Sequence, residues 1–137
     1  MIIILDSNIL FSALIKDSLT RKLIYGLHED LIFPEIVLDE LRKYKEELIS
    51  KSMLNEVEFD EVLSLILKYI RIIPNEQLKP HKKEAWELIK EYSPEDVMFI
   101  ACCLAFDNSI LWSDDKKLKR QEKVKVLNTA EITKLLR

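Results

Sequence analysis

Acidic side chains are spread along this sequence at positions where folding could gather them around a metal ion. The candidates are Asp6, Glu40, Asp96 and the adjacent pair Asp114 and Asp115. Carboxylates that met at one place would repel each other unless cations were present, and structure alone gives no reason to gather them. Hard divalent ions prefer carboxylate oxygens, and Mg²⁺ is typically held by a few such ligands while it keeps several waters. From the joint pattern we infer a bound Mg²⁺ or Mn²⁺.

Each acid taken alone also has a structural explanation. Asp6, or one of the two polar residues after it, could cap the helix that follows, because short polar side chains accept hydrogen bonds from the free N–H groups of a helix start. Asp114 and Asp115 could form a solvated turn, and a lone helical glutamate such as Glu40 usually faces solvent. The functional interpretation therefore depends on the convergence of the acids.

The residues around Asp96 match the start of a helix. In Ser93–Asp96 the serine fits the N-cap, the proline fits the first helical position, and the acid can return a hydrogen bond. Tyr92 and Val97 are placed to form a hydrophobic staple. Capping alone would account for Asp96.

Short apolar runs predict the strands that must position these acids. The run Ile2–Leu5 is unbroken and mostly β-branched, which is typical of a buried central strand. The other expected strands are Leu31–Phe33, Ile70–Ile73, Ile110–Ser113 and Val124–Leu127. Strands that alternate with helices favour a parallel sheet, whose carboxyl ends share one edge. Asp6 and the pair Asp114 and Asp115 would then meet at that edge.

Apolar residues recur at helical spacing between these runs. The expected helices are Asn8–Lys16, Ser18–Leu27, Glu35–Lys51, Phe59–Tyr69, Lys82–Tyr92, Ser93 to about Phe106, and Asn128–Leu136, with Asn75–Pro80 as a loop. Ser18 fits an N-cap, Gly26 lies near a helix end, and Asn128 with Glu131 matches a capping box. The alternation predicts a three-layer α/β sandwich around a central parallel five-stranded sheet, formed by one domain over residues 1–137.

Composition excludes several classes of protein. The 137 residues are 48% apolar, which is enough for a core without disulfides or zinc. Gly26 is the only glycine, so the Gly-rich phosphate loops of P-loop and dinucleotide-binding proteins are ruled out. The neighbouring Cys102 and Cys103 favour a reduced, cytoplasmic protein. No stretch approaches the roughly 20 apolar residues of a membrane span, and a net charge of −3 gives no overall attraction to nucleic acid.

The acidic segments, in their order, resemble the PIN-domain ribonucleases over essentially the whole chain. The matching segments are Asp6–Asn8 after an apolar strand, Pro34–Leu41 with Glu40, Glu95–Ala101 with Asp96, and Ile110–Lys116. The resemblance implies a PIN-like fold and a Mg²⁺- or Mn²⁺-dependent endoribonuclease that hydrolyses RNA phosphodiester bonds. Cys102 and Cys103 replace the small apolar residues of common members, which bears on packing more than on chemistry.

Carried over residue by residue, the resemblance places the family's acidic site on Asp6, Glu40, Asp96 and Asp115. It implies that Asp6 and Asp96 ligate the metal directly, and that Asp115 and Glu40 complete the ligand set or orient waters.

Three polar residues would support these acids. Ser113 matches the family's small hydroxyl residue two positions before the last acid, and Ser113 or Asn8 would hold the ligands in place. Asp114 falls at a variable, often polar position, where it either supports a ligand or is an additional one.

A basic run follows the last acid and is the candidate contact for RNA phosphates. Its cationic residues are Lys116, Lys117, Lys119 and Arg120. A solvated charged loop is the alternative explanation. Trp112 and Trp86 could be offered as stacking platforms, but a buried strand for the first and an amphipathic helix for the second favour core packing.

The resemblance leaves the biological role open between two classes. A short single-domain PIN protein resembles the toxins of toxin-antitoxin pairs, which implies an antitoxin partner near the acidic edge and a homodimer. The alternative is a catalytically silent PIN-like module that binds RNA or a protein without cutting. A phosphatase or receiver domain fits less well, because Asp6–Asn8 lacks the second acid of the phosphatase motif.

Overall fold

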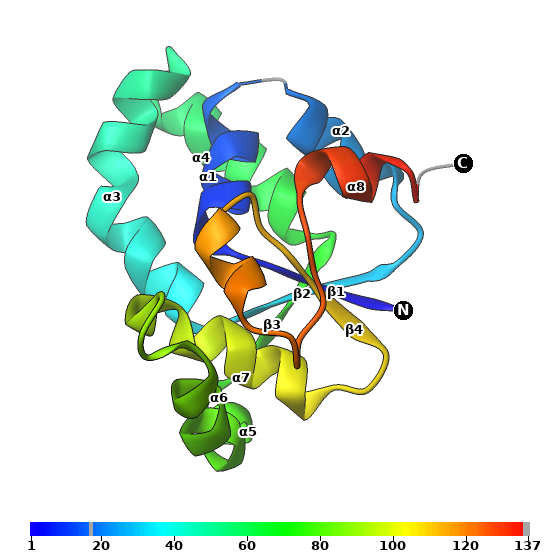
Figure 1. Cartoon of the computed structure of the whole chain (residues 1–137). Helices are drawn as coiled ribbons and strands as arrows, with labels where there is room; N and C mark the ends of the chain where they lie inside the picture. Colours follow the sequence, from blue (N-terminus) through cyan, green and yellow to red (C-terminus); the bar gives the residue numbers. More distant parts are fainter. Residues whose placement is uncertain (17, 136–137) are drawn as a thin grey trace.

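A five-stranded parallel sheet forms the centre of the computed structural model, which describes residues 1–16 and 18–135 (Figure 1). The strand order is β3-β2-β1-β4-β5. The strands are β1 (Ile2–Leu5), β2 (Asp30–Pro34), β3 (Ile70–Ile73), β4 (Ser109–Trp112) and β5 (Val126–Leu127). All five expected strands are confirmed, with shifts of one or two residues at their ends.

Strand β1 occupies the middle of the sheet, as its unbroken apolar run predicts. It pairs with β2 on one side and β4 on the other, and Ile3, Ile4 and Leu5 are fully buried. The pairing with β4 continues one residue further, because the backbone N–H of Asp6 donates to the carbonyl of Trp112 at 3.2 Å. Asp6 therefore stands at the carboxyl edge of the sheet, where the neighbouring strands β1 and β4 end.

Helices cover both faces of the sheet, which confirms the three-layer α/β sandwich (Figure 1). They are α1 (Ser7–Ile15), α2 (Leu19–Gly26), α3 (Ile36–Ser52), α4 (Glu56–Leu67), α5 (Asn75–Leu78), α6 (Lys82–Ile89), α7 (Val97–Ala105) and α8 (Thr129–Thr133). Helix α7 packs on one face against the central strands, with α5 and α6 behind it. Helices α1, α2 and α4 pack together on the other face, and α3 lies along α1.

Side-chain caps explain the starts of α1, α2, α4 and α8. Ser18 caps α2 through a hydrogen bond from the Arg21 N–H at 3.4 Å, and α2 ends at Gly26, as the sequence indicates. The predicted capping box at Asn128 is also present. A further capping box at Asn55, which the apolar spacing does not reveal, starts α4 at Glu56 rather than at Phe59. The closing helix stops at Thr133, before the expected end, which lies outside the described residues.

The segment expected to be a loop at Asn75–Pro80 is helical instead. It contains α5 and a 3₁₀ turn, η1 (Lys79–His81). Two contacts stabilise it: Leu78 is fully buried as α5 packs on α7, and the Asn75 N–H donates to Glu35 Oε1 at 2.8 Å. Tertiary packing has therefore overridden the local signal of turn-forming residues.

Two other expectations about the helices on this face need correction. The helix predicted over Lys82–Tyr92 ends at Ile89, with Lys90 as its C-cap. Trp86 is 44% exposed, so the expectation that it packs in the core is wrong. Trp112, by contrast, is fully buried in β4, as expected.

Both cysteines, Cys102 and Cys103, are buried residues of α7 and are free thiols. Burial raises the pKa of Cys102 to about 12 and raises that of Cys103 well above its usual value. They are therefore packing residues. No helix among the described residues is long and apolar enough to cross a membrane.

A buried glutamine closes the loop that leads into β5. The carbonyls of Leu118 and Val124 accept from Gln121 Nε2 at 2.9 and 2.8 Å, and the Val124 N–H donates to Gln121 Oε1 at 2.8 Å. Because Val124 is held by this side chain, β5 begins only at Val126, two residues later than predicted.

We expect Gln121→Ala to lower the free energy of unfolding by about 2 to 4 kcal/mol, because it leaves buried backbone groups without partners. Urea denaturation measures the change. The matched control is Gln77→Ala on an exposed face of α5, which should stay within about 0.5 kcal/mol of the wild type. Equal stability of both variants would contradict the role given to Gln121.

Candidate active site

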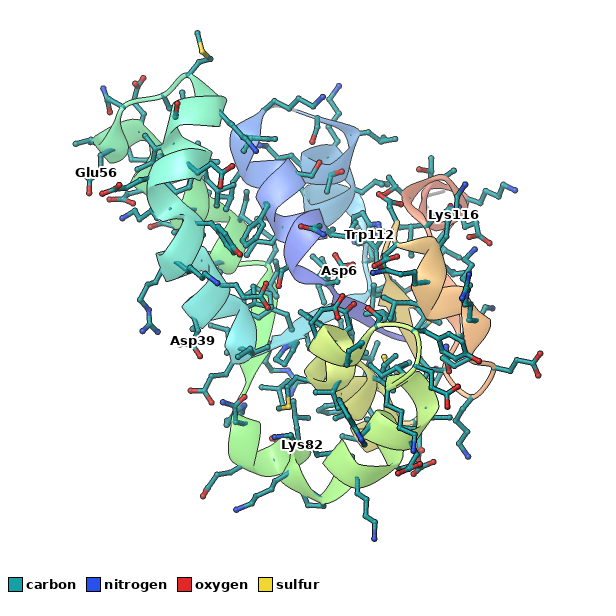
Figure 2. The ribbon with its side chains drawn as sticks, turned by 60° about the vertical axis from the view of Figure 1, so that its left-hand side comes forward. Asp6, Asp39, Glu56, Lys82, Trp112 and Lys116 are labelled. Atoms are coloured by element: carbon teal, nitrogen blue, oxygen red, sulfur yellow. The ribbon has the colours of Figure 1, made fainter. Side chains whose placement is uncertain are left out.

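A cavity of about 320 Å³ opens at the carboxyl edge of the sheet, where the acidic residues meet. Its lining includes all four acids that the resemblance selected, Asp6, Glu40, Asp96 and Asp115. They come from the end of β1, from α3, from the start of α7 and from the segment after β4. Figure 2 shows Asp6 near the middle of the molecule and Asp39 on the outer side of α3.

Asp6 is the most buried of these acids, with 6% of its surface exposed. It caps α1, since the Ile9 N–H donates to its Oδ1 at 3.0 Å. The structural explanation of Asp6 as a helix cap is therefore correct. Its pKa is raised to about 6, chiefly by burial and to a smaller extent by the charges of Asp96 and Asp114, against the opposing effect of the Ser113 hydroxyl and the Ile9 N–H. A cap alone gives no reason for three other acids to line the same cavity.

Glu40 faces the cavity from the second turn of α3. Burial raises its pKa, the charge of Asp96 adds to the increase, and Ser7 and Lys43 oppose it. Its neighbour Asp39 is exposed and pairs with Arg42 at 3.4 Å, as its place on the other side of the helix predicts.

Asp96 precedes α7 at the end of a 3₁₀ turn, η2 (Pro94–Asp96). Ser93 is the N-cap of this turn and Pro94 opens it, as predicted, but the Ser93 side chain accepts no backbone hydrogen bond there. The hydroxyl of Ser93 donates instead to the Asp96 carboxylate and lies 3.1 Å from Glu95 Oε1. Burial raises the pKa of Asp96, and the charges of Glu95 and Asp115 contribute to this increase. Capping therefore does not account for this acid.

Asp115 reaches the cavity from the loop after β4. Its Oδ1 accepts from the Lys117 N–H at 3.0 Å and so caps the 3₁₀ turn η3 (Lys116–Arg120). Its own N–H donates to Ser113 Oγ at 3.1 Å. Ser113 is almost fully buried and also interacts with Asp6, so this hydroxyl links two of the acids.

Asp114 makes different contacts from Asp115 and does not line this cavity. Its two carboxylate oxygens accept from the N–H and the hydroxyl of Thr129 at 2.7 and 2.9 Å, and Thr129 Oγ1 accepts from the Trp112 indole at 3.0 Å. Asp114 thus ties the start of α8 to the end of β4.

We expect Asp114→Ala to lower the free energy of unfolding by about 1 kcal/mol, as the loss of a helix-start acceptor usually does. Binding of Mn²⁺, measured by titration calorimetry, should change by less than about threefold, because the carboxylate is directed at Thr129. Loss of Mn²⁺ binding in this variant would make Asp114 a ligand, the other role that the sequence left open.

Asn8 is exposed at the rim of the cavity. The hydroxyl of its neighbour Ser7 is buried and has no hydrogen-bond partner within residues 1–16 and 18–135. Support for the acids therefore comes from Ser113, and the Ser7 hydroxyl lies near Glu40 without a hydrogen bond of good geometry to it.

Sequence reasoning missed four residues that line the cavity, Ser7, Lys43, Tyr44 and Glu95. Lys43 and Tyr44 follow Glu40 by three and four positions, which is the spacing of neighbours on one helix face. That spacing was a usable signal. Glu95 adjoins Asp96, and its contact with Lys117 at 3.6 Å depends on two segments far apart in the sequence.

The basic run is a 3₁₀ turn, not a loop, and most of its cations have partners in the chain. Lys117 contacts both Glu95 and Asp115, at 3.6 and 3.9 Å, and Lys119 pairs with Glu131. The Arg120 guanidinium lies 5.7 Å from the centre of the Tyr92 ring. Lys116 is exposed at the surface (Figure 2).

The donor set suits a hard divalent cation, although its carboxylates stand apart across the cavity. In the described part of the chain, no three acidic, histidine or cysteine side chains are close enough to form a ready coordination group. The oxygen-only chemistry nevertheless fits Mg²⁺ or Mn²⁺. Burial and mutual repulsion raise the pKa of Asp6, Glu40 and Asp96, and a cation would relieve that repulsion.

Fold and cavity together define a parallel α/β protein with an acidic site at the carboxyl edge of its sheet. The family model of the PIN domain matches residues 4–136, so the chain belongs to the PIN domain family, whose members are in general nucleases. A chain in the crystal structure of VapBC2 from Rickettsia felis, bound to a DNA fragment from their promoter, has a similar fold. The TM-score is 0.69 at 20% identity, over 93% of this chain and 98% of that one. A search of curated proteins found no match.

Proposed function

We propose that this protein is a divalent-metal-dependent endoribonuclease that hydrolyses RNA phosphodiester bonds. The observation that carries the proposal is the convergence of Asp6, Glu40, Asp96 and Asp115 on one cavity from four separate elements. The match of the PIN domain over nearly the whole chain supports the same chemistry. Half-buried carboxylates that raise each other's pKa are costly, and a functional cation explains why they are gathered.

In this proposal Asp6, Asp96 and Asp115 hold Mg²⁺ or Mn²⁺. The bound cation supplies Lewis acidity and neutralises the charge that develops on the phosphate. Asp6 is fixed by its cap on α1, and Asp115 is fixed by the hydrogen bond to Ser113 and by its cap on η3. These contacts keep the carboxylates in place for ligation, which is the role that supporting residues commonly have around metals.

Glu40 has a separate role in this mechanism, the orientation of the attacking water. It lies on α3, across the cavity from the segment that carries Asp115, and its pKa is raised by burial. A carboxylate with a raised pKa is a better proton acceptor than a free one. Its position beside the buried Ser7 hydroxyl supports this role.

RNA phosphates would be bound by the basic run that follows the acids. Lys116 is free to reach them, whereas Lys117, Lys119 and Arg120 would exchange their present partners for phosphates. Phosphate contacts of this kind make RNA binding weaker as the salt concentration rises.

We further propose that the protein is the toxin of a toxin-antitoxin pair and acts in the cytoplasm as a homodimer. The support is the fold shared with a chain of the VapBC2 complex, over 98% of that chain's length. An antitoxin would then cover the acidic cavity. The neighbouring reading frame provides a direct check, because a small co-encoded partner is required.

The test of the enzymatic proposal is an RNA cleavage assay with the full chain. We expect cleavage of single-stranded RNA with Mn²⁺ and none with EDTA. Protein prepared in parallel with the Asp6→Asn substitution identifies contaminating nucleases. A wild-type protein that binds RNA without cutting it would instead support the silent binding module. Absence of both would reject the nuclease and restrict the silent module to binding a protein.

A further inference from the structure

A second hollow adjoins the acidic cavity and differs from it in chemistry. It measures about 450 Å³, lies between α1 and α3, and shares Asn8, Glu40 and Tyr44 with the first cavity. These two helices pack side by side (Figure 1). Phe11 and Ile15 contribute apolar surface on the α1 side. A substrate bound at the acids can therefore extend into this groove without a break.

Tyr44 stands at the junction of the two hollows. It is 38% exposed although its ring is held in place. The Phe11 ring meets it edge-on, with centroids 6.2 Å apart, and Lys43 Nζ lies 5.2 Å from its centre. An aromatic ring fixed in this way loses little conformational entropy when a planar ligand stacks on it. Among the residues lining either hollow, Tyr44 is the aromatic one common to both.

Lys43 supplies a cation beside this ring. It lines the acidic cavity and has no ion pair within the described part of the chain. An unpaired cation next to an exposed ring matches the two parts of a nucleotide, a phosphate and a base. Single-stranded nucleic acids are commonly bound in this way, by bases stacked on aromatic side chains and phosphates held by cations.

We propose that Lys43 and Tyr44 form the subsite for the nucleotide next to the cleaved phosphate, with its unpaired base stacked on Tyr44 in the groove and its phosphate on Lys43. This inference rests on the proposed function, because it assumes an RNA strand at the acids. It implies a preference for single-stranded over paired RNA, since a base in a duplex cannot enter the groove.

The experiment measures stacking directly and without catalysis. A short single-stranded RNA that contains 2-aminopurine is titrated with the full chain in EDTA, and both the base fluorescence and the affinity are recorded. We expect the wild type to quench the fluorescence, Tyr44→Phe to retain the quenching, and Tyr44→Ala to lose it with about 5- to 150-fold weaker binding. The plot of log K against log salt concentration should have a slope that is smaller in magnitude by about 0.7 for Lys43→Gln than for the wild type.

Matched controls are Tyr69→Ala and Lys22→Gln. Tyr69 is 49% exposed and also has a ring partner, Tyr25 at 4.9 Å, but it lines neither hollow. Lys22 is exposed on α2. Both variants should bind and quench as the wild type does.

The outcomes separate this inference from the function on which it rests. Unchanged quenching and affinity in Tyr44→Ala, with Mn²⁺-dependent cleavage intact, would overturn the subsite alone. If Tyr44→Ala leaves RNA quenching and affinity unchanged but weakens the binding of an antitoxin, the groove binds a protein segment and not a base. A wild-type chain that neither binds nor cuts RNA would overturn both proposals.

Discussion

Replacement of Asp6 by asparagine is expected to lower Mn²⁺-dependent RNA cleavage by at least about 100-fold while the fold is retained. The side chain of asparagine still accepts the Ile9 N–H, and asparagine caps helices as well as aspartate does. What the substitution removes is one negative charge, the most buried one in the cavity. Cleavage rates with limiting RNA, measured with circular dichroism of the same preparations, test the expectation.

The control for this prediction is Asp39→Asn. Asp39 is one residue from Glu40 but exposed on the outer side of α3, so its variant should cleave at the wild-type rate (Figure 2). Full activity of Asp6→Asn would remove the metal-dependent mechanism. Equal loss in both variants would point to a general effect of charge instead of ligation.

The same substitution is expected to stabilise the metal-free protein at pH 7. The Asp6 carboxyl has a pKa of about 6 in the folded protein against 3.8 without the protein environment, a difference worth about 3 kcal/mol at most. Below pH 3.8 the carboxyl is protonated in both states and has no effect. As the pH rises toward 6, the unfolded chain releases this proton first, so the folded state loses stability. Asparagine at position 6 has no proton to release and avoids that loss.

Urea denaturation in EDTA should therefore show a gap between Asp6→Asn and the wild type that opens between about pH 4 and 6 and persists at pH 7. Saturating Mn²⁺ reverses the order. At 1,000 times its dissociation constant, a ligand adds about 4.1 kcal/mol to the protein that binds it, which exceeds the gap, and only the wild type should gain this. A metal-free Asp6→Asn protein that is less stable than the wild type at pH 7 would contradict the cost assigned to the buried charge.

Much of the scaffold was readable from the sequence because its strands are short, continuous and apolar. Ile2–Leu5 could be placed at the centre of a parallel sheet from its composition, and that placement fixed the position of Asp6. Caps at Ser18 and Asn128 were recognisable because they depend on residues three positions apart. These signals are local in sequence, and local preferences predict the structure correctly where tertiary packing favours the same conformation.

Other features depend on contacts between distant segments. Helix α5 forms where turn residues suggested a loop, because Leu78 is buried against α7. The resemblance distinguishes Asp115 from Asp114, but only the location of Thr129 shows that Asp114 is tied to α8. Lys117 similarly meets Glu95 across the cavity mouth. Side-chain roles of this kind follow from the assembled fold.

The parallel order of the strands also separates the molecule into two ends with different tolerance to change. Every strand has its carboxyl end at the edge of the sheet where the cavity lies, so the turn at Asp107–Asn108, just before β4, lies at the opposite edge. Asn108 has a positive φ of 54°, and its residue type accepts that conformation. A fluorophore or a short inserted peptide attached at this turn would leave the acidic edge unobstructed, which makes the turn the place to immobilise the protein for single-molecule work.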